Sequence, residues 1–103
     1  MRERLPDRRE AETFDVEALG LQFRATLGRF ADGRLAEVFL TNHKAGSMAG
    51  ILASDSAVLC SIALQYSVPV DVIRKALMRD PHGRPSGPLG AVLDLIADEE
   101  TPG

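Results

Sequence analysis

The feature that most constrains this chain is an apolar run in its middle, Ala57 to Leu64, which only Cys60 and Ser61 interrupt. Around this run, apolar residues recur at intervals of three and four, the period of an α-helix: Met48, Ile51, Leu52, Leu59, Ile62, Ala63 and Tyr66. A helix that is apolar nearly all round is usually covered on most sides. The sequence therefore predicts a central helix that forms the core of the fold.

Both ends of this central helix carry signals. Ser47 is placed to be the N-cap, because its hydroxyl can accept a hydrogen bond from a first-turn N–H. Pro69 ends this helix or starts the next one, since proline cannot donate an interior hydrogen bond. A second, amphipathic helix is expected after it, with Asp71 in its first turn and Lys75 and Arg79 in its last, where these charges complement the helix dipole.

Three segments before the central helix alternate between apolar and polar residues, the pattern of a half-buried strand. They are the stretch around Phe14 and Val16, Leu21 to Leu27, and Leu35 to Thr41. Short turns at residues 18–20 and 31–34 join them, so the strands should be antiparallel neighbours. The best core face of the third strand is formed by Ala36, Val38 and Leu40.

The remainder of the chain completes the fold prediction. Residues 80–88 are rich in proline and glycine and should form a loop. A short helix is expected next, with Pro88 in its first turn and Leu89, Val92, Leu93 and Ile96 on its apolar face. The predicted class is α+β: a three-stranded antiparallel meander followed by two or three helices packed on one face. We expect a charged arm over residues 1–12, one domain over 13–97 and a frayed acidic tail over 98–103.

Composition excludes several classes of function. The net charge of -3 gives no general affinity for nucleic acid or for an anionic membrane. No apolar run approaches the roughly 20 residues that span a bilayer. The charged N-terminus has no apolar segment typical of a secretory signal. One cysteine cannot form an intramolecular disulfide, which agrees with a reducing compartment. We therefore expect a cytoplasmic protein that binds neither nucleic acid nor membrane.

Two surface features suggest a protein interface. Phe39 should lie on the outer face of the sheet beside Arg24, either as an isolated exposed aromatic or as part of a covered face. The N-terminal arm carries Arg8 and Arg9, and it is either solvated or paired with a partner. Because a three-stranded sheet also has two edges that can pair with another chain, we expect a homo-oligomer, most simply a dimer.

The turn from Lys44 to Ser47 is the most ligand-like segment. It joins a strand to a helix and contains Lys44, Gly46 and Ser47, and helix N-termini attract anions. The segment lacks the full spacing of a glycine-rich phosphate loop, however. It is therefore either a weak nucleotide or phosphate site or only a tight turn that caps the helix.

Other reactive residue types do not form a recognisable site. Cys60 lies in the most apolar part of the central helix and is expected to be buried and unreactive. His43 and His82 are the only histidines, so with one buried cysteine they do not make a zinc set, and no metal is expected. Asp55 lies between Leu52 and Leu59 on the helical net. It should be either exposed or bonded to a backbone N–H or an arginine.

Several segments together resemble a known family. They are RERLPDRRE, DGRLAEVFLTNHKAGS and ALQYSVPVDVIRKAL. The chain resembles the TSCPD domain, found at the C-terminal end of adenosylcobalamin-dependent ribonucleotide reductases and also alone in small proteins. The family's Thr-Ser-Cys-Pro-Asp motif should fall at residues 85–89, where Ser86 and Pro88 agree but Gly87 and Leu89 replace the cysteine and the aspartate.

This resemblance and this departure together set the functional expectation. Reductases of this family need one cysteine for the thiyl radical and a redox pair to reduce the sugar, and one cysteine cannot fill three roles. The chain is therefore not expected to be an enzyme or to hold a cofactor. The leading hypothesis is a non-catalytic accessory or regulatory module that binds a protein, with the reductase catalytic chain as a candidate partner. The alternative is a small nucleotide- or phosphate-binding module that uses the turn from Lys44 to Ser47.

Overall fold

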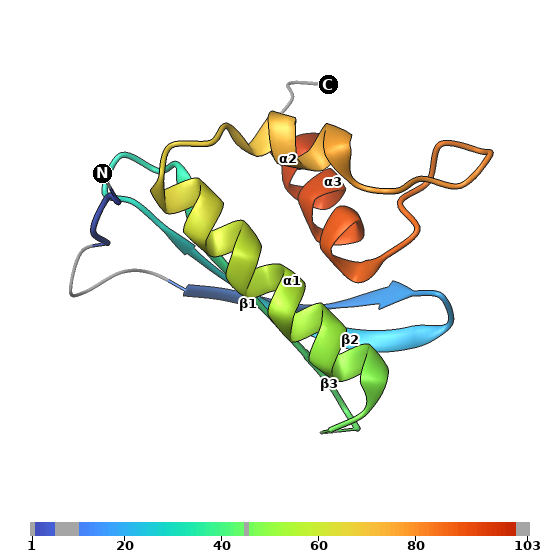
Figure 1. Ribbon diagram of the computed structural model, residues 1–103. Helices are drawn as coiled ribbons and strands as arrows, with labels where there is room; N and C mark the ends of the chain where they lie inside the picture. Colours follow the sequence, from blue (N-terminus) through green and yellow to red (C-terminus); the bar gives the residue numbers. More distant parts are fainter. Residues whose placement is uncertain (1, 6–10, 45, 101–103) are drawn as a thin grey trace.

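The computed structural model describes residues 2–5, 11–44 and 46–100, which form a three-stranded sheet followed by three helices. The elements are β1 Ala11–Ala18, β2 Leu21–Arg29, β3 Leu35–Asn42, α1 Met48–Gln65, α2 Val70–Ala76 and α3 Pro88–Glu100. The strand order is β1-β2-β3 and both pairs are antiparallel. Figure 1 shows the helices on one side of the sheet, with α1 running diagonally across it. The predicted α+β meander is confirmed.

The sheet follows the alternation of its sequence. Leu19 and Gly20, both at positive φ, form the two-residue turn between β1 and β2. The inner face of the sheet is buried: Val16, Ala18, Phe23, Ala25, Leu27, Ala36, Val38 and Leu40. The predicted core face of β3 is therefore correct. Leu21, which shares the alternation of β2, is nevertheless 43% exposed.

The buried side of α1 differs from the prediction. Small residues, Ala53, Ala57 and Cys60, face the sheet with Leu64. Met48, Ile51, Leu52, Leu59 and Tyr66, which define the helical period in the sequence, are exposed. Small side chains let a helix approach a sheet closely. The sheet covers one side of α1, and no second layer of the described residues covers the opposite side. The expectation that α1 is covered on most sides is wrong.

Two polar residues of α1 satisfy backbone groups of β3. The Ser61 hydroxyl accepts from the Val38 N–H at 2.8 Å and lies 3.0 Å from the Val38 carbonyl oxygen. The Gln65 amide donates to the Ala36 carbonyl at 3.2 Å. Since β3 is an edge strand, α1 occupies the polar edge groups that could otherwise pair with another strand.

The segment after α1 contains a second correction. Pro69 is the N-cap of α2, which ends at Ala76, so Arg79 lies outside the helix. Arg79 instead forms two hydrogen bonds of 2.7 and 2.8 Å with the carboxylate of Asp94 on α3. These bonds hold the pKa of Asp94 below its ordinary value. Arg79 thus ties the loop to α3 rather than stabilising the end of α2.

The described residues near both ends of the chain make contacts or belong to elements that the sequence did not predict. At the N-terminus, the Arg2 side chain donates to Gln65 at 2.6 Å, and the Arg34 guanidinium contacts the Glu3 carboxylate at 2.9 Å. Residues 2–5 therefore pack on their own chain. β1 already begins at Ala11, within the expected arm, and α3 continues to Glu100, within the expected tail. The expected apolar face of α3 is buried as predicted: Leu89, Val92, Leu93 and Ile96.

Candidate docking surface

The largest exposed apolar feature of α1 is its side opposite the sheet. We call this side the outer face of α1. Its exposed residues are Met48, Ile51, Leu52, Asp55, Val58 and Leu59, and it also includes the half-buried Ile62 and the C-cap residue Tyr66. Met48 is 72% exposed and Leu59 is 69% exposed, although both are apolar. An exposed stripe of this kind is a common sign of a surface that another molecule covers.

Asp55 lies in the middle of this face. It is the single charged residue of α1, a helix that is described throughout its length. Asp55 is exposed, and no described residue forms a hydrogen bond or ion pair with its carboxylate. Of the two alternatives drawn from the sequence, the structure therefore supports an exposed carboxylate.

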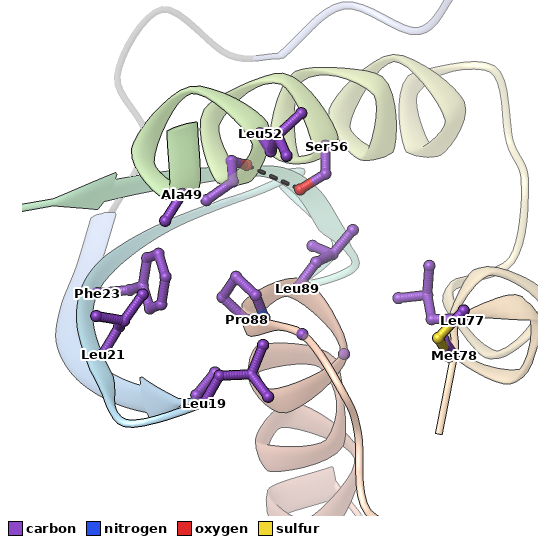
Figure 2. Close-up of a pocket in the computed structure, with 14 residues that line it drawn as sticks. Leu19, Leu21, Phe23, Ala49, Leu52, Ser56, Leu77, Met78, Pro88 and Leu89 are labelled. Carbon is purple, nitrogen blue, oxygen red and sulfur yellow. Dashed lines mark hydrogen bonds between the residues drawn. The ribbon is translucent and has the colours of Figure 1, made fainter. Parts of the chain in front are cut away.

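An apolar cavity adjoins the outer face of α1. It has a volume of about 340 Å³ and lies between the β1–β2 turn, the first half of α1 and the start of α3. Figure 2 shows Leu19, Phe23 and Pro88 around it, with Leu52 on the α1 side. Ser56 supplies the hydroxyl in this lining, and it already donates to the Ala53 carbonyl at 2.8 Å. The cavity therefore suits an apolar group.

The segment in which the sequence predicts the family motif lies at this cavity. Gly87, Pro88 and Leu89 all line it. A Cβ atom added to Gly87 would meet no heavy atom within 4 Å, and the backbone there is not left-handed. The structure thus has room for a side chain at the position where the motif has its cysteine.

The turn before α1 caps the helix as predicted. The Ser47 hydroxyl accepts a hydrogen bond from the Gly50 N–H at 3.1 Å, and Gly46 has a φ of 80°. Lys44 is exposed, and it lines a shallow depression that Asp55 also borders. A carboxylate beside this depression disfavours an anion. The capping role is confirmed, while a nucleotide or phosphate site remains a prediction.

The structure brings together two of the four predicted interface residues. Phe39 is 46% exposed and pairs with Thr26 across the β2–β3 ladder. Arg24 lies on the same outer face of the sheet and forms an ion pair with Asp15 at 3.2 Å. Arg8 and Arg9 lie outside the described residues. The outer face of the sheet is thus mostly polar around one aromatic side chain.

The remaining reactive groups form no site in the described part of the chain. Cys60 is 4% exposed, and burial raises the pKa of its thiol to about 11. A protonated, buried thiol is a poor nucleophile and a poor metal ligand. Among residues 2–5, 11–44 and 46–100, no group of three or more His, Cys, Asp or Glu could hold a metal ion.

α1 is also long and apolar enough to cross a membrane, by length and composition alone. This property differs from the expectation that no apolar run approaches the length of a span. One third of α1 is buried within the protein. Ser61 and Gln65 are bonded to β3, so α1 has a defined place in this fold.

Comparison with known proteins places the chain in a family. The model of the TSCPD domain matches residues 5–98, nearly the whole chain. The chain belongs to the TSCPD domain family.

Curated relatives of this TSCPD domain are much longer proteins. The vitamin B12-dependent ribonucleotide reductase of Rhodopirellula baltica is 40% identical over 72 residues, which cover 70% of this chain and 7% of the reductase. The reductases of Bradyrhizobium diazoefficiens and Agrobacterium fabrum are 37% and 36% identical over 70 residues, each covering 68% of this chain and 6% of the relative. No solved structure matches the chain. This TSCPD domain therefore spans less than a tenth of the length of these reductases.

The outer face of α1 and the adjoining cavity are the features that sequence reasoning missed. A signal for the first was present, because Ala53, Ala57, Cys60 and Leu64 recur at intervals of three and four on the opposite side of the helix. For the cavity there was no local signal. Its lining joins residues from the β1–β2 turn, α1 and α3 that are far apart in the sequence.

Proposed function

We propose that this TSCPD domain is a non-catalytic accessory or regulatory module of ribonucleotide reduction, which acts in the cytoplasm by binding another protein. The observation that carries this proposal is the outer face of α1, where Met48, Leu52 and Leu59 are each more than half exposed. Large apolar side chains grouped on one helix face are a feature of binding surfaces.

The thiol inventory supports a role without catalysis. The chain has one cysteine, and Cys60 is buried with its pKa raised to about 11. The radical and redox steps of these reductases call for several accessible thiols. A chain with one buried thiol would need another chain to supply that chemistry.

The relatives support the choice of partner. In three vitamin B12-dependent ribonucleotide reductases, a segment similar to this chain is part of a much longer protein. A domain that packs against a reductase in one protein can bind a separate reductase chain in another. We therefore take the catalytic chain of a ribonucleotide reductase as the partner.

A capture experiment tests this function. The tagged protein is mixed with the purified reductase large chain of the same organism, and the bound fraction is measured. Leu59→Asp, on the outer face of α1, should abolish capture. Val72→Asp is the matched control, because Val72 is 57% exposed and lies on α2. Capture that is absent in the wild type, or that both variants retain equally, contradicts the proposal.

A further inference from the structure

We infer that the occupant of the outer face of α1 is an amphipathic helix of a partner protein, which places a lysine or arginine opposite Asp55. This inference rests on the proposed function, since it names the kind of surface that the module binds.

The spacing of the outer face fits a second helix. Its central line alternates steps of four and three residues: Met48, Leu52, Asp55, Leu59, Ile62 and Tyr66. This alternation is the heptad pattern with which one helix packs against another along a seam. The 18 residues of α1 give a seam about 27 Å long. A partner that binds through a flat surface would not require this heptad spacing of apolar residues.

The size of the outer face fits the same occupant. Its apolar side chains are exposed along the length of the helix, from Met48 at 72% through Leu59 at 69% to Tyr66 at 55%, and an extended patch of this kind is a feature of interaction surfaces. The surface also continues into the apolar cavity, because Leu52 lies on the outer face and lines the cavity. One large apolar side chain near the end of the partner helix could fill part of that cavity.

Asp55 specifies the charge of the partner. Covering its carboxylate with a purely apolar surface would leave a charge without a partner, which is costly. A basic side chain on the facing helix would neutralise it and add a charged hydrogen bond. Within α1 itself no lysine or arginine is available for this role, and Lys44, which borders the same depression as Asp55, forms no ion pair with it.

A second copy of the chain is a poorer occupant for the same reason. In a parallel pair, Asp55 would face Asp55. In an antiparallel pair centred on the seam, Asp55 would face Leu59, and the two carboxylates would lie about one helical turn apart. Both arrangements bring like charges together in an apolar seam, which disfavours pairing.

A membrane surface is also a poorer occupant. Helices that lie in a membrane interface usually carry lysine and arginine on their polar side. α1 has no basic residue, and its single charge is an acid in the middle of the apolar face. A bilayer would bury that acid without a counter-charge.

Charge reversal with two peptides tests the inference. Each is a stabilised helix of about 20 residues with leucine at heptad positions. The two differ at one central position, which is lysine in the first and glutamate in the second. Affinity is measured by fluorescence anisotropy for the full chain, for Asp55→Lys, and for Asp98→Lys as a control with the same charge change at an exposed site on α3.

The wild type should bind the lysine peptide about tenfold or more tightly than the glutamate peptide. Asp55→Lys should reverse this order, and Asp98→Lys should keep it. Circular dichroism checks that each variant is folded.

Four results would overturn the inference. They are equal affinity for the two peptides, binding of neither, self-association of the wild type that Leu59→Asp abolishes, and capture by anionic vesicles that Leu59→Asp abolishes. If the reductase is captured through Leu59 while the peptides fail, the inference falls and the proposed function stands. If the peptides behave as expected while the reductase is not captured, the inference stands and the choice of reductase as partner falls.

Discussion

Cys60 and Gly87 represent two opposite environments for a thiol in this protein. Cys60 packs between α1 and the sheet and keeps its proton, because burial raises its pKa to about 11. Gly87 stands at the apolar cavity, with open space where a side chain would be. The resemblance to the family places the motif's cysteine at this open position, where the chain has Gly87.

A Gly87→Cys variant should contain one fast and one slow thiol. We expect a thiol reagent to label residue 87 faster than Cys60 in the same folded protein, because residue 87 is half-buried beside open space whereas Cys60 is 4% exposed. Peptide mapping by mass spectrometry measures both rates. In the wild-type control, labelling of Cys60 should accelerate as the pH rises toward 11, where its thiolate forms. Labelling of native Cys60 as fast as free cysteine would contradict this account.

Ser47 should stabilise α1 by about the typical value of an N-cap. Ser47→Ala removes the bond to the Gly50 N–H and should lower the free energy of unfolding by about 1 kcal/mol. Ser54→Ala is the control, because Ser54 is an exposed serine within the same helix. Denaturant titration measures both. An effect of Ser47→Ala no larger than that of Ser54→Ala would show that the cap contributes nothing.

The same turn gives a direct test of the alternative function. If Lys44 and the start of α1 hold a phosphate, a millimolar nucleotide should raise the melting temperature, and Lys44→Ala should remove the rise. A melting temperature that does not respond to nucleotide would leave this turn with its capping role alone.

At the scale of elements, α1 has two roles. It packs small residues against the sheet, and it bonds the outward-facing backbone groups of the edge strand β3. The Ser61 hydroxyl accepts from the Val38 N–H on β3 at 2.8 Å, and its single proton lies between two carbonyl oxygens, that of Ala57 at 2.9 Å and that of Val38 at 3.0 Å. The Gln65 amide donates to the Ala36 carbonyl of β3 at 3.2 Å. The polar residues of α1 therefore lie where the apolar pattern alone would predict none.

Removing the Ser61 hydroxyl should be costly for its size. Ser61→Ala leaves the Val38 N–H buried without this partner, and we expect a loss of about 1–3 kcal/mol in the free energy of unfolding. Ser56→Ala is the control, because its hydroxyl bonds to Ala53 within the same helix. Denaturant titration of the two variants decides the matter. A loss in Ser61→Ala equal to that in Ser56→Ala would mean that the edge bonds add no stability.

The elements that sequence predicted correctly are those with one possible interpretation. The strands and α3 have a single apolar face, so the alternation and the helical period each identify the buried side. α1 has two apolar faces with the same period, small residues such as Ala57 on one and large ones such as Leu59 on the other. Which face is buried depends on the distance between α1 and the sheet. That distance cannot be predicted from the spacing of residues within α1.

A similar ambiguity explains the end of α2. Arg79 fits the last turn of a helix by its charge, but its partner Asp94 lies 15 residues further along the chain. Pairing across such a distance depends on the loop and on the docking of α3. The sequence therefore identified Arg79 as a stabilising charge, but it did not predict that Arg79 lies in the loop after α2 and pairs with Asp94.

At the scale of the whole molecule, two faces point in opposite directions. The outer face of α1 is apolar around one acid, whereas the outer face of the sheet is polar around Phe39. Because the sheet separates them, occupation of one leaves the other free. A two-fold dimer through the sheet could therefore carry a partner helix on each copy.

The predicted homodimer should accordingly depend on Phe39 and not on Leu59. The ion pairs around Phe39, such as Arg24 with Asp15, offer both signs of charge to a second copy, which suits a self-complementary two-fold interface. We expect sedimentation equilibrium to show a dimer at high concentration that Phe39→Asp weakens and Leu59→Asp retains, while capture of the reductase shows the reverse dependence. A strict monomer at every concentration would exclude the dimer. A dimer that Leu59→Asp disrupts would place self-association on α1, and the sheet face would then be only a solvated surface with one exposed aromatic residue.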